Sequence, residues 1–197
     1  MTESSARANA PAKSSPKATR YNGVAMAAHW LLALGLIAAL ALGWYMTGLP
    51  FSPSRLKLYN WHKWLGVTLL TLSLLRLVWR ITHRPPELPA AVARAMPQWQ
   101  HWAHNGTHHA MYLLFFAVPL TGWAYSSASG FRVLWFGRIA LPDFVPVSQA
   151  LADNLKLSHN VLAMGLALLV LVHVAAALKH HFVDGDGLMS RMLPGRD

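Results

Sequence analysis

The chain has 197 residues, of which 54% are hydrophobic and only 12% are charged, and its formal net charge is +10. Its apolar segments are nonpolar on every side and close to the length that crosses a bilayer, which excludes a soluble all-helical domain with polar helix faces. The absence of cysteine excludes disulfides, c-type haem attachment and iron–sulfur ligation by this chain. The composition therefore predicts a basic membrane protein.

Four apolar segments of membrane-spanning length follow one another along the chain. We expect the spans at about residues 24–46, 60–81, 106–125 and 157–181. Residues 1–19, rich in Ser, Ala, Pro and Lys, are expected to form a disordered basic tail, and residues 183–197 a polar tail. The first apolar run is too long for the apolar core of a signal peptide. The predicted fold is an all-α membrane protein, with a four-helix up-down bundle in a domain over residues 20–182.

The connections between these spans differ in character. Residues 82–99 contain four prolines and are expected to form a loop. Residues 126–156 form the longest connection, with a short amphipathic helix expected at 147–156, before the fourth span. Within the third span, Pro119 is expected to kink the helix.

Basic residues divide unevenly between the two sides of the predicted bundle. Four spans place both termini on one side, and that side carries eleven of the Lys and Arg residues against six on the other. By the positive-inside rule, the termini and the second-to-third loop are expected in the cytoplasm.

Two histidines in the fourth span, His159 and His173, are 14 residues apart. On a helix this spacing places them on nearly the same face, about 21 Å apart along the axis. An imidazole in hydrocarbon costs free energy unless something binds it. In an up-down bundle, His62 begins the second span at the depth of His159, and His29 enters the first span at the depth of His173. Counting residues thus predicts two opposed pairs, His62/His159 on the outer side and His29/His173 on the inner side.

Two imidazoles opposed across an apolar core match the axial ligands of a b-type haem, so two pairs predict two haem b groups. Gly66, one turn after His62, would leave room for a flat ring. Arg76, at the depth of the inner pair, finds no Asp or Glu in the four spans, so a haem propionate is its expected partner. The alternatives are interhelical hydrogen bonds for the histidines and snorkelling to the interface for Arg76.

The remaining histidines carry weaker signals. His180 shares a face with His173 and is a rival inner ligand, although its interfacial depth disfavours it. His108 opens the third span, where it either contacts a propionate or a quinone or is exposed at the interface. A histidine-rich zinc or copper site is not expected, because no helix offers carboxylate or thiol companions. The histidines expected to be solvated are His83, His101 and His104.

Several segments together carry a resemblance to a known family. They are YNGVAMAAHWLL, LYNWHKWLG with RLVWR and RPP, HHAMYLLFFAVPLTGW, and LSHNVLA followed by HVAAALKHHFVDGDGLMSRMLP. Over about residues 21–194 the chain resembles the bacterial cytochrome b561 family of small four-helix dihaem membrane proteins. The resemblance implies a multi-pass protein of the bacterial inner membrane with haem iron held by His29, His62, His159 and His173. The third span departs from the family pattern, since His104 and His108 are four apart where the family often has two histidines three apart.

The resemblance also implies electron transfer with ubiquinone, and for the best known member oxidation of superoxide at the outer face. The predicted outer loops agree with an anionic substrate, because a basic mouth would steer a small anion inward. The alternative is a cytochrome b subunit that relays electrons for a dehydrogenase or hydrogenase complex, with a redox protein as donor. A transporter is disfavoured by the lack of membrane carboxylates. The outer basic residues are Arg55, Lys57, Lys63, Arg132, Arg138 and Lys156, against Asp143 and Asp153.

Overall fold

The computed structural model describes residues 20–193 and Gly195, apart from the side chains of residues 91 and 95. The tail expected at residues 1–19 lies outside the described residues. The helices are α1 (Gly23–Thr47), α2 (Pro53–Thr82), α3 (Ala90–Ala95), α4 (Gln98–Ala128) and α5 (Gln149–Lys179). Strands β1 (Leu134–Trp135) and β2 (Ile139–Ala140) form an antiparallel hairpin. Two short turns complete the order, the π-helical η1 (His180–Asp184) and the 3-10 turn η2 (Met189–Met192).

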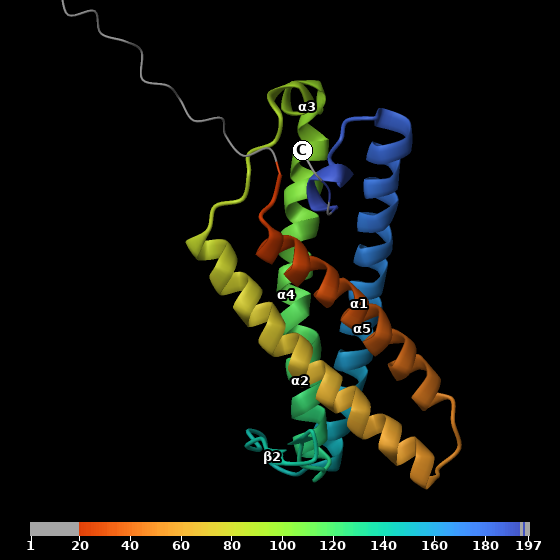
Figure 1. Ribbon diagram of the computed structural model, residues 1–197. Coiled ribbons are helices and arrows are strands. Elements are labelled where there is room, and N and C mark those ends of the chain that lie inside the picture. The colour runs from red at the N-terminus through yellow and green to blue at the C-terminus, as the bar shows by residue number, and fades with distance from the viewer. Residues whose placement is uncertain (1–19, 194, 196–197) are drawn as a thin grey trace, which may run out of the picture.

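The four long helices form a bundle of two antiparallel pairs (Figure 1). Helix α1 packs against α2 and α4 packs against α5, while a contact between α2 and α4 joins the two pairs. The α1–α2 pair is inclined across the α4–α5 pair. The β1–β2 hairpin lies at one end of the bundle, and α3 lies with the C-terminal segment at the other.

Three helices in the described part of the chain are long and apolar enough to cross a membrane: α1, α2, and α5 with its continuation to Asp184. Large apolar side chains on them are exposed, as for Leu34 and Leu171 at 64% and 67%, which suits contact with lipid. Helix α4 is as long, but its first half, QWQHWAHNGTHH, is polar. A membrane crossing by α4 stays a prediction.

The helices extend beyond the apolar segments that the sequence marks. Helix α2 begins at Pro53, where Ser52 Oγ accepts a hydrogen bond from the backbone nitrogen of Arg55 at 3.2 Å. The amphipathic segment expected at 147–156 is not a separate helix, because nothing breaks the chain between it and the rest of α5. The expected loop at 82–99 contains the short helix α3 and the beginning of α4.

The segment after α5 folds back against the start of the described chain. Arg191 is buried, and its guanidinium donates to the carbonyls of Pro86 at 3.1 Å and Glu87 at 2.7 Å. Its own carbonyl accepts a hydrogen bond from the backbone nitrogen of Tyr21 at 3.3 Å. Residues near both ends of the chain are thereby held at one end of the bundle.

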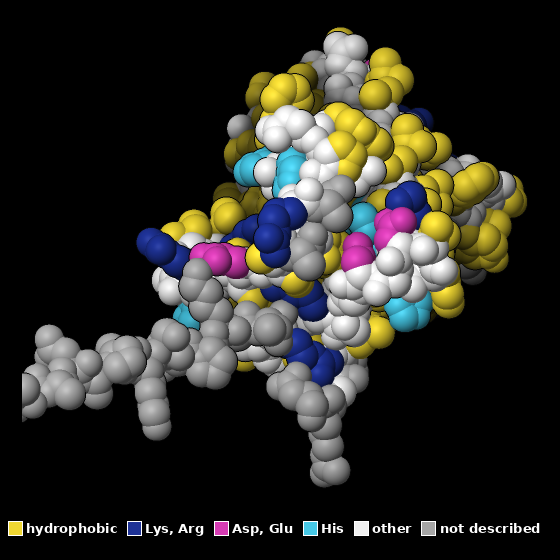
Figure 2. Space-filling view, turned by 90° about the horizontal axis from the view of Figure 1, so that it is seen from above, with side chains coloured by type: hydrophobic (Ala, Val, Ile, Leu, Met, Phe, Trp, Pro, Cys, Tyr) yellow, Lys and Arg dark blue, Asp and Glu magenta, His cyan; other side chains and the backbone are white. Residues whose placement is uncertain are grey.

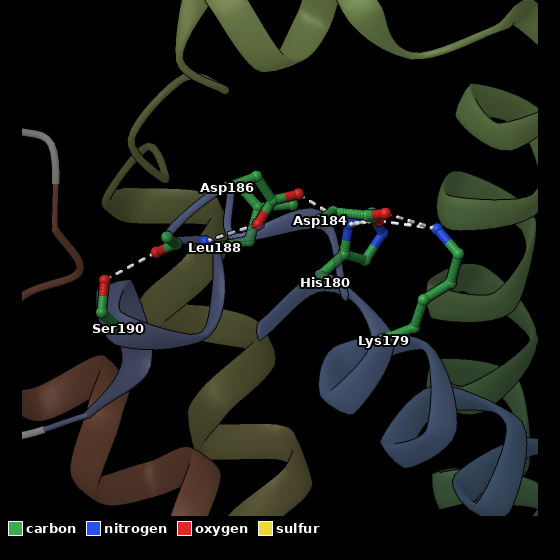
Figure 3. Close-up of polar contacts among 7 residues, drawn as sticks. Lys179, His180, Asp184, Asp186, Leu188 and Ser190 are labelled. Carbon is green, nitrogen blue, oxygen red and sulfur yellow. Dashed lines mark hydrogen bonds and ion pairs between the residues drawn. The ribbon is translucent and has the colours of Figure 1, made fainter. Parts of the chain in front are cut away.

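A charged network fixes the turn into this segment (Figure 3). The Lys179 ammonium lies 2.6 Å from Asp184 Oδ2 and forms an ion pair with it. His180 Nδ1 donates to Asp186 Oδ2 at 2.6 Å. The other oxygen of Asp186 accepts from the backbone nitrogen of Leu188 at 3.0 Å, so the network ties the end of α5 to the returning chain.

We predict that Arg191→Gln destabilises the contacts between the C-terminal segment and residues 86 and 87, and so lowers the stability of the protein. The shorter amide would leave the Pro86 and Glu87 carbonyls unpaired, at a cost of about 2 kcal/mol. For a chain of this size that cost lowers the Tm by about 6 °C, which thermal unfolding of the purified protein in detergent would measure. Arg138→Gln is the matched control, since Arg138 is exposed at the other end. An equal shift in both variants would contradict the prediction.

Candidate functional site

His62 of α2 and His159 of α5 face each other near the hairpin end, with ring centroids 6.1 Å apart. An imidazole nitrogen binds a metal at about 2 Å and lies about 1 Å from its own ring centre, so two imidazoles on opposite sides of one ion have centroids about 6 Å apart. His159 Nδ1 donates to the Val118 carbonyl at 2.9 Å, which leaves Nε2 free to bind a metal. His62 Nδ1 is buried and has no hydrogen-bond partner among the described residues. The outer pair fits two axial ligands of one iron.

His29 of α1 and His173 of α5 form the second pair, with centroids 6.3 Å apart. Arg76 of α2 reaches the same depth, and its guanidinium donates to His29 Nδ1 at 3.2 Å. His108 of α4 is also present, since its ring centroid lies 5.4 Å from that of His173 and its Nδ1 donates to the His104 carbonyl. The structure therefore brings together the inner pair and Arg76 at one depth, and it adds His108 to them.

Two glycines give the outer histidines their space. A Cβ atom at Gly43 would lie 3.1 Å from His62 Cε1, and one at Gly122 would lie 2.9 Å from His159 Cε1. Any larger residue would push these rings out of place. At Gly66, which the sequence singled out, a Cβ would meet nothing within 4 Å, so the face beside His62 is open. Of these three glycines, only Gly66 is predicted from the sequence; Gly43 and Gly122 emerge from the structure.

A regular spacing in the sequence could have revealed both glycines. Each long helix carries two residues of the site 14 positions apart, a separation that returns to nearly the same helix face about 21 Å further along. One residue of each couple belongs to an inner layer and the other to an outer layer. The couples are His29 and Gly43 on α1, His62 and Arg76 on α2, His108 and Gly122 on α4, and His159 and His173 on α5.

The other histidines lie outside these two layers. His180, the rival inner ligand, turns its Nδ1 toward Asp184 and Asp186 instead. His180, Asp184 and Asp186 offer ligand atoms within 4.8 Å of one another. This histidine therefore has the carboxylate neighbours that the four predicted spans lack. The Lys179 ammonium forms an ion pair with Asp184, so the cluster is explained by ion pairing and needs no metal ion. His83, predicted to be solvated, is exposed and stacks on a tryptophan, Trp79, at 3.7 Å between centroids.

Comparison with known proteins places this arrangement in a family. The family described as prokaryotic cytochrome b561 matches residues 20–195. "Cytochrome b561 homolog 2" of Escherichia coli (strain K12) is 34% identical over 176 residues, which cover 88% of this chain and 91% of the relative. "Probable superoxide oxidase CybB" of Yersinia pestis is 31% identical over 180 residues, 89% of this chain and 96% of the relative. "Cytochrome b561 homolog 1" of Escherichia coli (strain K12) is 30% identical over 183 residues, 90% and 98% of the two chains.

The match covers all four long helices and every residue of the two layers. Half-buried imidazole pairs in an apolar helical bundle are also the chemistry that haem iron requires. The chain therefore belongs to the prokaryotic cytochrome b561 family, whose members are membrane helical bundles that bind b-type haem and transfer electrons.

Proposed function

We propose that this protein is a dihaem cytochrome that passes electrons from superoxide at its outer face to ubiquinone. The observation that carries the proposal is the presence of two imidazole pairs, His62/His159 and His29/His173, each with the centroid separation of two ligands on one ion. Since the family binds b-type haem, two pairs indicate two haems. The site residues proposed to hold the cofactors are these four histidines and Arg76.

The proposed topology has four membrane crossings, with α4 as the third and both termini in the cytoplasm. An even number of crossings requires the two chain ends to share a side, and the contact between Tyr21 and Arg191 supports this. The excess of Lys and Arg on that side favours the cytoplasm. The histidine pair near the hairpin, His62 and His159, would then lie toward the outer face of the inner membrane.

A b-type haem with two histidine ligands supplies one-electron oxidation and reduction and has no open position for oxygen. The chain holds and orients the ligands: the Val118 carbonyl fixes the ring of His159 through Nδ1. An imidazole that binds metal through Nε2 carries its proton on Nδ1, so the Arg76 guanidinium would exchange His29 Nδ1 for another acceptor. A propionate carboxylate is the acceptor that suits a guanidinium at this depth.

The outer face supports superoxide as the electron donor. Lys63 follows His62 in sequence and is half-buried, with Nζ 3.4 Å from Ser126 Oγ. Arg132 pairs with Asp143 at 2.9 Å and lowers the pKa of that carboxyl, so these two charges largely cancel. The other basic side chains of this face leave a positive field that attracts a small anion. They are Arg55, Lys57, Arg138 and Lys156.

The proposed reaction transfers two electrons from superoxide to ubiquinone. Two superoxide anions each give up one electron and become dioxygen. Ubiquinone takes both electrons together with two protons and becomes ubiquinol. His62 and His159 would hold the haem nearest the outer face, and that haem would supply one-electron transfer from superoxide without a bond between superoxide and iron.

Haem content tests the core of the proposal. The purified protein is expected to hold about two b-type haems per polypeptide, and His159→Ala about one, because each iron needs both of its axial ligands. His109→Ala is the matched control, since His109 is exposed on α4 and its Nδ1 donates to the Asn105 carbonyl. A pyridine haemochrome assay with protein quantification gives the count. One haem in the unchanged protein, or an equal loss in both variants, would refute dihaem binding.

Gly122→Ala is predicted to disturb the outer haem alone. The added methyl group would overlap the His159 ring, so the content of b-type haem should fall from about two toward one. Gly106→Ala, on the same helix, is the control, because a Cβ there would meet nothing within 4 Å. Reduced-minus-oxidised spectra and redox titration would show whether one of two haem transitions is lost. Full occupancy of both haems in Gly122→Ala would be evidence against the layered site.

Superoxide decay in stopped flow tests the donor. The protein with ubiquinone is expected to accelerate the decay, and Lys63→Gln to slow the accelerated rate about threefold at low ionic strength, with a weaker salt dependence. Arg94→Gln, which removes a charge at the opposite end, should leave the rate unchanged. Haem content is measured alongside, so that cofactor loss is separated from lost steering.

Two results would overturn superoxide as the donor. One is decay no faster than spontaneous dismutation. The other is haem reduction only in the presence of a soluble dehydrogenase, which would assign the chain to electron relay.

A further inference from the structure

A pocket of about 350 Å³ lies at the end of the bundle where Tyr21 and Arg191 meet. It is enclosed by the start of α1, the last turns of α2, the middle of α4 and residues 83–87. Four arginines and one glutamate line it, so its wall is strongly positive. Figure 2, which views this end of the molecule, shows several Lys and Arg side chains on this face, with Asp and Glu side chains beside some of them.

The pocket extends outward from the inner histidine layer. Arg76 borders it at the depth of His29. Arg80 lies one turn further along α2, about 6 Å nearer the helix end, and Arg84 lies just beyond the end of the helix. Arg76 is therefore the arginine placed to serve a haem at the inner pair, whereas Arg80 and Arg84 are placed closer to the membrane interface.

The walls of the pocket offer hydrogen-bond donors. Arg80 lies over the Tyr112 ring at 5.7 Å from its centroid, and both Arg80 and Arg84 are exposed. Exposed guanidinium groups can donate charge-assisted hydrogen bonds to a ligand rich in acceptor oxygens. Guanidinium groups additionally favour an anion over a neutral molecule such as a quinone.

The surroundings of the pocket indicate where this anion comes from. In sequence, Val24 of α1 directly precedes the lining residue Ala25, and Val78 and Ile81 of α2 flank the lining residues Trp79 and Arg80. Their side chains are exposed at 53%, 52% and 73%, so they are available to contact acyl chains. We propose that the pocket binds the phosphate group of an anionic phospholipid through Arg80 and Arg84, with the acyl chains lying along α1 and α2.

Native mass spectrometry of the purified, haem-loaded protein tests this proposal. The protein is exchanged into detergent containing phosphatidylglycerol or, in a parallel sample, phosphatidylcholine, and bound lipid is counted. Phosphatidylglycerol should be retained preferentially, and Arg80→Gln/Arg84→Gln should weaken its binding at least about tenfold, the effect of losing one charge-assisted hydrogen bond. Arg84→Gln alone changes only an exposed side chain, so it tests the site even if the double variant misfolds.

The control is Arg55→Gln/Arg138→Gln at the opposite end. It is matched in charge, and Arg55 also lies over a tyrosine ring, that of Tyr59, at 5.5 Å. This control should keep the lipid.

Three results would overturn the proposal. Equal lipid retention by the Arg80/Arg84 variant and the control would show that these arginines do not form the site. Displacement of phosphatidylglycerol by millimolar inorganic phosphate would identify free phosphate as the ligand. Haem loss in the variant, measured by absorbance, would assign Arg80 and Arg84 to the haem. Lipid binding requires neither superoxide nor ubiquinone, so its outcome is independent of the proposed reaction.

Discussion

The structure depends on a constraint that acts on the histidine rings: an imidazole in an apolar interior needs a partner for its nitrogens. The direct packing of long helices joins α1 to α2 and α4 to α5, with the α2–α4 contact between the pairs. The imidazole pairs cross this division, because α5 supplies His159 opposite α2 and His173 opposite α1. Metal ligation at both depths would therefore connect the two halves of the bundle, in addition to the buried cluster of Leu36, Met111 and Leu166 that already joins α1 to α4 and α5.

The layers need empty space as much as they need ligands. The outer layer combines two histidines with Gly43 and Gly122, whose missing side chains leave room for the imidazole rings. The inner layer instead combines two histidines with Arg76 and His108, both polar. The two proposed haem sites thus differ in their surroundings even though their ligands are the same. Charge and hydrogen bonding near a haem are among the factors that set its potential, so the layers would hold haems of unequal potential.

The sequence predicts the juxtaposition of the histidine rings because helix rise and up-down order fix depth, and the structure brings the same rings together. The 14-residue spacing would also have yielded Gly43 and Gly122 had it been applied to the first and third spans. The ends of the helices are less predictable than their existence. An apolar run shows only the part of a helix that fits the hydrocarbon layer, whereas the hydrogen bond that Ser52 accepts determines where α2 begins. The hydrogen bonds of Arg191 cannot be predicted from the sequence, because its acceptors are backbone carbonyls, which every residue carries.

Helix α2 shows how depth determines the partner that a cation needs. The stretch from His62 to the helix end at Thr82 contains no carboxylate, so Arg76 and Arg80 must find their anions outside this segment. At the depth of Arg76 the surroundings would be protein and the proposed haem, and the proposed anion is a propionate. One turn further out, at Arg80, the helix approaches the interface, where phospholipid phosphates are abundant. A single helix would thus carry, in order of depth, a ligand of the outer haem, the counter-charge for a propionate of the inner haem and a lipid contact, each following from the medium around it.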